Sequence, residues 1–279
     1  MANAKNSKIG MRQREVQGVR LGLSMLFCLN KPLKSALETL SQVEVEHIEV
    51  VDDGMHELNS RKIKAIKEFI GGRDLTVSVH APFADINIAS TSPSIRNVIM
   101  KRLKKSMELS SKLDPECWVF HPGVRSALGD IVPGLDWKIN LDSIRNLLRN
   151  ARQHGIKIAI ENTPRTFPFL LRYVEDFKRF YEELGDEGLE LGIAFDVGHA
   201  NISGQLDEML RYFHDKIVHT HLHDNNGDRD SHLGIGFGRI NWPKLMESLM
   251  GIRYNGVLVI ESISNIEESI KFLRELIGR

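Results

Sequence analysis

The segment LGIAFDVGHANISG, residues 191–204, begins with a short apolar run and ends on a glycine. The run LGIAFD contains no polar residue before Asp196. A short, continuous apolar run of this kind is typical of a parallel strand that is covered on both faces. Asp196 at its end and His199 three residues later both carry groups that can bind a metal ion. The segment therefore predicts a buried strand that delivers polar side chains at its C-terminal end.

Seven further runs of the same kind are spaced along the chain. They are VRLGLSML (19–26), HIEVVD (47–52), LTVSVH (75–80), CWVFH (117–121), IKIAIE (156–161), IVHTHLH (217–223) and VLVIE (257–261). Between them, apolar residues recur at every third or fourth position, which indicates amphipathic helices. Ser92 before Pro93, and Ser264 three residues before Glu267, are typical helix starts.

Eight strand–helix units without a break in composition predict an α/β protein with a single (β/α)8 TIM barrel over residues 19–279. The 279 residues of the chain are close to the ~250 that are typical of one such barrel. An open, doubly wound sheet is the alternative, but no glycine-rich phosphate loop follows the first strand. Residues 1–18 are polar and basic, and we interpret them as a solvated N-terminal extension.

Composition limits the classes of function. The chain has 37 Lys or Arg and 37 Asp or Glu, so its formal net charge is zero. This balance argues against a dedicated nucleic-acid binder, because phosphate contacts come largely from Lys and Arg, although a bound metal can replace missing charge. No membrane-spanning run or signal peptide is evident, so we expect a cytoplasmic protein with no membrane partner. The two cysteines, Cys28 and Cys117, fit no zinc or redox spacing.

Six consecutive predicted strands carry imidazole or carboxylate groups at or just beyond their C-terminal ends. The set is His80, His121, Glu161, Asp196, His199, His221, Asp230, His232 and Glu261. In a parallel barrel all strand C-termini open onto one face, where active sites are built. Ionisable groups crowded there would repel one another or stay unpaired unless a cation offsets them. Because these nitrogen and oxygen donors suit zinc or manganese, the sequence predicts a divalent-metal site at the C-terminal face.

A resemblance to the xylose isomerase-like barrel superfamily is carried by six strings. In order, these are VSVHAPFADINIA, VFHPG, IAIENTP, FDVGHANISG, HTHLHDNNGDRDSHLGIGFG and VLVIES. The superfamily includes sugar (phosphate) isomerases and epimerases and, separately, the endonuclease IV enzymes that cut DNA at abasic sites. The resemblance extends from about residue 19 to residue 279.

The resemblance to endonuclease IV implies a trinuclear zinc site, and all nine ligands have counterparts here. The three ion sites would be His80–His121–Glu161, Glu161–Asp196–His221–Glu261 and His199–Asp230–His232. The metal-ligand pattern of the isomerases and epimerases resembles only the middle set. These four residues would surround one metal, with His199 near the substrate. There, Glu161 and Glu261 would flank the substrate carbon and exchange its proton through an enediolate. The resemblance thus implies catalytic roles for Glu161, Glu261 and His199.

Other polar residues are alternatives or supports. His223 competes with His221, since both point to the same side of a strand. We favour His221 because Asp224, three residues later, matches the histidine-to-aspartate spacing of the superfamily. We interpret His219 as a residue that fills the barrel more deeply. The remaining candidates are Asn162 and Asn225 as hydrogen-bond partners of ligands, Arg229 as either a contact for a phosphate or sugar oxygen or an exposed loop residue, and Glu49 and Asp52 without an assigned role. Many members of the superfamily carry Gly-Glu-Gly after the last histidine, where this chain has Gly236–Phe237–Gly238, so the resemblance implies that an acid is lost at the rim.

Charge and loop length separate the two functions. Three Zn²⁺ ions against four carboxylates leave a formal charge of +2, which suits a phosphodiester, whereas one ion against three carboxylates leaves −1, which suits a neutral ketose. The first two predicted strand–helix loops are short and carry no Arg or aromatic wedge for DNA. We therefore predict an isomerase or epimerase that uses one to three divalent ions, Zn or Mn, on a small sugar, polyol or sugar phosphate. The alternative is an endonuclease IV-like hydrolase of abasic-site DNA. The sequence leaves the oligomeric state open.

Overall fold

A computed structural model describes residues 18–278 and contains a closed barrel of eight parallel strands. Neighbouring strands pair in sequence order, and β8 closes the barrel against β1. The strands are β1 (Arg20–Ser24), β2 (His47–Val51), β3 (Thr76–His80), β4 (Trp118–Phe120), β5 (Ile158–Glu161), β6 (Leu191–Asp196), β7 (Ile217–Leu222) and β8 (Val257–Ile260). This confirms the predicted single (β/α)8 barrel. The predicted extension lies, apart from Gly18, outside the described residues.

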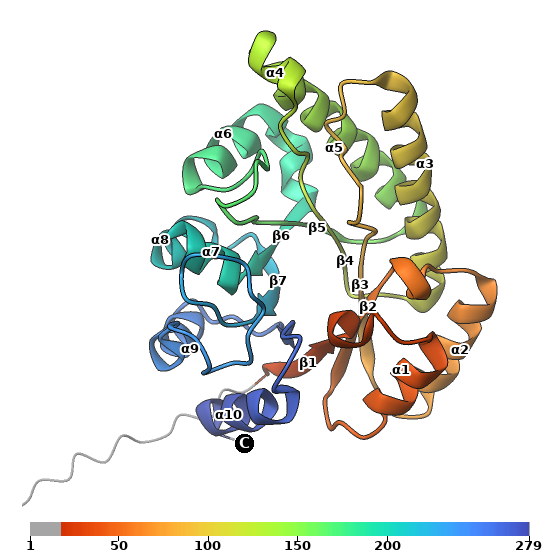
Figure 1. Cartoon of the computed structure of the whole chain (residues 1–279), viewed down its shortest axis with the longest axis vertical. Helices are drawn as coiled ribbons and strands as arrows, with labels where there is room; N and C mark the ends of the chain where they lie inside the picture. Colours follow the sequence, from red (N-terminus) through yellow and green to blue (C-terminus); the bar gives the residue numbers. More distant parts are fainter. Residues whose placement is uncertain (1–17, 279) are drawn as a thin grey trace, which may run out of the picture.

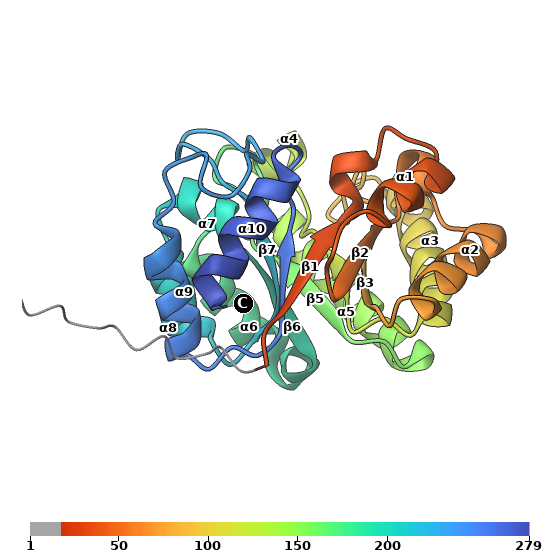
Figure 2. The ribbon, with the colours of Figure 1, turned by 90° about the horizontal axis from the view of Figure 1, so that it is seen from below.

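Helices form a ring around the strands (Figure 1). The α-helices are α1 (Leu33–Leu40), α2 (Ser60–Gly71), α3 (Pro93–Ser110), α4 (Ala127–Ile131), α5 (Leu135–His154), α6 (Val174–Leu184), α7 (Val197–Ser203), α8 (Leu206–Phe213), α9 (Trp242–Gly251) and α10 (Ile266–Ile277). Short 3-10 helices are η1 (Met25–Cys28), η2 (Gly54–His56), η3 (Ser111–Leu113) and η4 (Gly185–Glu190). Figure 2 shows α1 to α3 on one side of the strands and α8 to α10 on the other. Among the described helices, none combines the length and the hydropathy needed to span a bilayer.

Element boundaries follow the predicted runs to within two residues, with two local differences. The first run was expected to continue to residue 26, but the chain turns into η1 after Ser24, whose side chain accepts a hydrogen bond from the Leu26 backbone N–H. The predicted cap at Ser264 is wrong by one residue. Asn265 occupies the cap of α10 in a left-handed conformation, which asparagine tolerates better than most residues.

The two faces of the barrel wall differ in character. Outward side chains such as Leu21, Ile48 and Trp118 are apolar and buried, and they belong to the core between strands and helices. Many inward positions are small or polar, as in Ala159 and Glu49, although Val119 is also among them. Such an interior departs from the branched apolar filling usual in these barrels. The apolar core therefore stabilises the wall from outside, while the interior is free to carry polar side chains up to the mouth.

Candidate metal centre

The nine sequence-predicted ligands converge at the C-terminal mouth of the barrel in three groups, two of which share Glu161. Strand ends supply His80, Glu161 and Asp196, while His121 and Glu261 follow directly after β4 and β8. The remaining ligands come from β7, from α7, and from the loop after β7: His221, His199, Asp230 and His232. Within each group the candidate ligand atoms lie within 4.8 Å of one another. Parallel strands end on one face, and this is what brings together residues that are distant in sequence.

The middle group consists of Glu161, Asp196, His221 and Glu261. His221 Nδ1 faces the three carboxylates, at 3.4 Å from Glu161 Oε1, 3.9 Å from Asp196 Oδ2 and 3.6 Å from Glu261 Oε2. Neither His221 Nδ1 nor Asp196 Oδ2, both buried, has a hydrogen-bond partner among the described residues. Ligands about 2.0–2.2 Å from a tetrahedral zinc ion stand roughly 3.3–3.6 Å apart. The group therefore fits a divalent cation by its donor set, its spacing and its unpaired buried atoms.

A second group lies beside the first and shares Glu161 with it. Glu161 Oε2 is 3.3 Å from His80 Nε2 and 3.0 Å from His121 Nε2, whereas Oε1 faces His221. One carboxylate thus directs one oxygen at each group. This is the arrangement in which a glutamate can bridge two metal ions, as the sequence resemblance implied.

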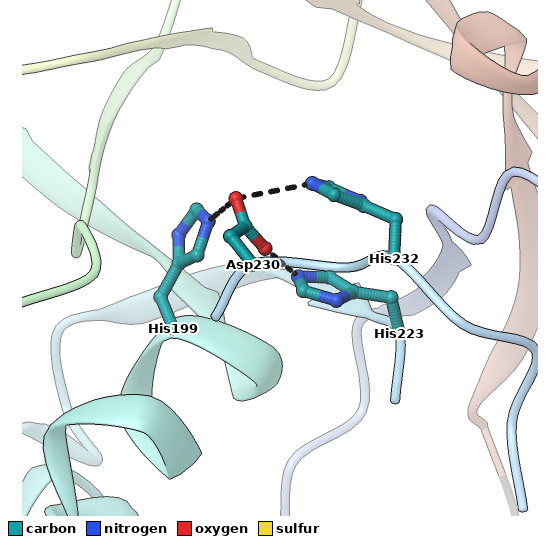
Figure 3. Close-up of side chains that lie close together, drawn as sticks. All are labelled: His199, His223, Asp230 and His232. Atoms are coloured by element: carbon teal, nitrogen blue, oxygen red, sulfur yellow. Dashed lines mark hydrogen bonds and ion pairs between the residues drawn. The ribbon is translucent and has the colours of Figure 1, made fainter. Parts of the chain in front are cut away.

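The outer group contains one residue that the sequence analysis did not assign to it. Asp230 lies between His199 and His232, with its Oδ2 3.1 Å from His199 Nε2 and 3.3 Å from His232 Nε2 (Figure 3). His223 completes the group, its Nε2 3.7 Å from Asp230 Oδ1 and its ring stacked 3.9 Å from that of His232. A Cβ at Gly198 would lie 2.0 Å from the His223 ring, so only glycine permits this position of the ring.

His221 and His223 are therefore not competitors, because each belongs to a different group. The two-residue period of the strand places both on the same side, and β7 continues this line inward to His219. His219 is buried and contacts Glu49 inside the barrel, as a residue that fills the interior should.

Backbone carbonyls orient three of the histidine rings. The Nδ1 atom of His80 lies 2.8 Å from the Ala81 carbonyl, that of His199 lies 2.9 Å from the Asn162 carbonyl, and that of His232 lies 2.9 Å from the Glu261 carbonyl. A carbonyl can only accept, so each Nδ1 carries the proton and donates it. Each Nε2 is then left as the nitrogen that faces a carboxylate and can bind a metal.

The pKa values of the carboxylates and imidazoles at the site are shifted toward the charged form of each group. Burial works to raise the pKa of Glu161, but His121 and His221 hold it well below its usual value. Burial works to lower the pKa of His232, yet Asp230 and Glu261 raise it to about 9. The pKa of His199 is likewise raised well above its usual value, against burial, by Asp196 and Asp230. Protonated imidazoles therefore balance the carboxylates, and a divalent ion would replace those protons.

Supporting residues divide into those at the site and those beside it. Asn162 pairs with the Asp196 backbone through two hydrogen bonds of 2.8 Å, and Asn225 Nδ2 donates to the Gly198 carbonyl at 2.9 Å. Both hold the segment that carries Asp196 and His199. Asp52 instead accepts hydrogen bonds from Arg102 outside the group of ligands, and Arg229 is exposed and is not among the residues that line the cavity. Glu49 lies beneath the middle group, in contact with His221.

A cavity of about 510 Å³ opens above the ligands. Its walls include Phe83, Phe167 and Phe169, and its floor includes Glu161 and Glu261. None of the described residues that line it is Lys or Arg. The cavity therefore combines metal-binding groups with aromatic rings that lie beside them.

The fold and the donor set define a (β/α)8 barrel protein with a candidate metal centre at its mouth. The chain belongs to the xylose isomerase-like TIM barrel family, whose profile matches residues 37–276. It is 32% identical over 270 residues to the uncharacterized protein MJ1311 of Methanocaldococcus jannaschii, covering 96% of this chain and 91% of that one. It is 27% identical over 208 residues to a probable endonuclease 4 of Staphylococcus aureus, covering 68% and 67%. Among solved structures, a D-tagatose 3-epimerase-like protein is 32% identical, with a TM-score of 0.86 and coverage of 93% and 97%.

Proposed function

We propose that the protein is a divalent-metal-dependent sugar isomerase or epimerase, which moves a proton on a small ketose or polyol. The observation that carries this proposal is the middle group, in which Glu161 and Glu261 share one ion-sized space with Asp196 and His221. When bound there, a Zn or Mn ion would polarise carbonyl and hydroxyl oxygens of the substrate. The likeness to the D-tagatose 3-epimerase-like protein supports this choice.

Proton transfer is assigned to the two glutamates. Glu161 ends β5 and Glu261 follows β8, so the two carboxylates reach the cavity from well-separated strands of the barrel. In the reaction, one carboxylate takes the proton from a carbon next to the substrate carbonyl, which gives an enediolate, and a carboxylate returns a proton to complete the change. His199 borders the same cavity and is placed to contact a substrate oxygen.

The cavity wall favours an uncharged sugar over a phosphorylated one. The rings of Phe167 and Phe169 are 5.2 Å apart, and Phe169 is 5.7 Å from His121, so they form a continuous apolar wall beside the ligands. The C–H face of a sugar can pack on such a wall while its hydroxyl groups face the polar floor. Because no Lys or Arg is among the described lining residues, a substrate phosphate would meet no side-chain cation other than histidine.

A second candidate is favoured by one specific observation, which is that all three groups of the endonuclease IV pattern are complete. Three zinc ions there would make the mouth electropositive and suited to a phosphodiester. The probable endonuclease 4 of Staphylococcus aureus supports this reading. The short loops after β1 and β2 and the apolar wall weigh against it.

Deuterium exchange tests the proposed reaction. Incubation of the metal-loaded protein with a panel of ketoses in D2O should place solvent deuterium on the carbon beside the carbonyl, because the carboxylate exchanges its proton with solvent between transfers. Mass spectrometry and NMR of the recovered sugar provide the measurement. Cleavage of an abasic-site duplex, with no deuterium in any ketose, would replace the proposal with the hydrolase.

Substitution of His80 or His121 by Ala separates the two functions. Both side chains belong to the group that they form with Glu161 and not to the middle group, so the proposed isomerase should keep one ion per chain. Its turnover should stay within about tenfold of the unsubstituted protein, with KM as the parameter most affected. Elemental analysis and steady-state kinetics provide the readouts, with His214→Ala as a control on the exposed end of α8. Loss of all activity together with one metal ion would favour the trinuclear hydrolase.

A further inference from the structure

A chain of hydrogen bonds runs inside the barrel from the N-terminal ends of the first three strands to the middle group. Arg20 Nη1 donates to Thr76 Oγ1 at 2.8 Å, and Thr76 Oγ1 is 2.8 Å from His47 Nδ1. His47 Nε2 is 2.9 Å from Ser78 Oγ, and Ser78 Oγ donates to Glu49 Oε2 at 3.1 Å. These residues come from β1, β2 and β3 and occupy inward positions that usually carry branched apolar side chains.

The direction of donation along this chain is set. Burial and the neighbouring His219 lower the pKa of His47 to about 3, so its ring is neutral and donates through one nitrogen only. Because Ser78 Oγ gives its proton to Glu49, the hydroxyl accepts from His47 Nε2. His47 and Ser78 therefore both donate toward Glu49.

Glu49 is fully buried and collects three donors. Besides Ser78, its Oε2 is 2.9 Å from His219 Nε2 and 3.2 Å from His221 Nε2. The contact with His221 matters most, because the opposite nitrogen of that ring, Nδ1, is the one that faces Glu161, Asp196 and Glu261. Backbone carbonyls hold the rings of His80, His199 and His232, whereas a carboxylate holds His221 from below.

We propose that Glu49 is the positioning residue of the middle group: it accepts the Nε2 proton of His221 and so holds Nδ1 free to bind a divalent cation. The donors Ser78 and His219 keep the carboxylate directed at His221. Glu49 does not line the cavity, and the member of the middle group that it contacts is His221. The inference rests on the proposed metal centre, but it is independent of which substrate the enzyme turns over.

Glu49→Gln has almost the same shape and removes this function. A glutamine offers one acceptor oxygen and two N–H donors where three donors now converge. If the amide nitrogen faces His221, the ring must accept through Nε2, and its proton moves to Nδ1, where it blocks the metal. We expect Zn²⁺ affinity at the middle group to fall by about 10- to 100-fold, as for other carboxylates behind a metal-bound histidine.

The test is a Zn²⁺ titration against a competing chelator, followed through the ring resonances of His221 in long-range ¹H–¹⁵N NMR spectra. Asp52→Asn is the matched control, because it makes the same change of a buried carboxylate to an amide three residues further along the chain, outside the group of ligands. Its affinity should stay within about threefold of the unsubstituted protein. The proposal is overturned if Glu49→Gln also stays within threefold, or if both variants lose affinity equally.

A second measurement applies even if Glu49→Gln fails to fold. In the zinc-loaded, unsubstituted protein, the spectrum should show a slowly exchanging proton on His221 Nε2 and metal-bound Nδ1. The reverse tautomer would overturn the proposal. Neither readout requires turnover, so a protein that binds zinc in this way but exchanges no ketose proton would contradict the proposed function and leave the role of Glu49 intact.

Discussion

Replacement of Glu161 by Gln is expected to lower turnover by at least ~10³-fold. Glu161 belongs to two of the metal-binding groups and is one of the two proposed proton-transfer carboxylates. Loss of a general base alone typically lowers a rate by 10²- to 10⁴-fold, and a neutral amide is also a poorer ligand. The effect should fall on kcat, because the apolar wall that packs the sugar is unchanged.

Two companion variants sharpen this experiment. Glu261→Gln should also reduce deuterium exchange, but it should spare the group formed by His80, His121 and Glu161. Glu190→Gln is the control, since Glu190 is exposed at the entrance to β6, on the opposite face of the barrel, where it pairs with Arg152. Activity of Glu161→Gln within tenfold of the unsubstituted protein would remove Glu161 from the mechanism.

The barrel could be predicted because buried parallel strands form recognisable apolar runs. LGIAFD, for example, coincides with β6 over its whole length. The misses were local and have local causes. The first strand ends early because the Ser24 side chain caps η1. Helix α10 begins after Asn265 in a left-handed conformation, whereas the sequence pattern predicted the cap one residue earlier, at Ser264. Backbone conformation at single residues depends on contacts that a linear pattern does not contain.

The convergence of the candidate ligands could be predicted from the sequence, because it follows from the topology of the barrel. Strand ends meet at one face, so the nine donors could be placed together from their positions in the runs. Depth within the barrel could not be predicted in the same way, because strand tilt and register set it. His221 pairs with Asp196 across the β6–β7 register, while His223 reaches the outer group and His219 stays below. The contact between Glu49 and His221 joins β2 to β7 across the barrel interior, so no spacing in the sequence indicates it.

Raising the pH from 6 to 8 is expected to tighten Zn²⁺ binding at the outer group by about 10²- to 10⁴-fold. In the metal-free protein, the pKa of His232 is raised to about 9, so this ring is protonated at neutral pH, and the pKa of His199 is raised well above its usual value. A metal binds the neutral imidazole, so one or two protons leave with each ion that binds. Each released proton adds tenfold in apparent affinity per pH unit below the pKa. The pKa of Asp230 is lowered by His199 and His232 against burial, so the carboxylate is ionised throughout.

Calorimetry in two buffers of different ionisation enthalpy counts the released protons, and chelator competition gives the affinity. The pH dependence of the folding stability gives an independent check, because its direction follows from the pKa shift. A histidine whose pKa is raised on folding adds stability that is complete below pH 6.5 and is lost as the pH rises through the folded value. For His232, a rise from 6.5 to about 9 corresponds to about 3 kcal/mol. The Tm of the metal-free protein should therefore fall between pH 7 and pH 9.5, whereas the zinc-loaded protein, in which the ion replaces these protons, should hold its Tm. Equal pH dependence of the two forms, with no proton release, would mean that zinc does not bind through these histidines.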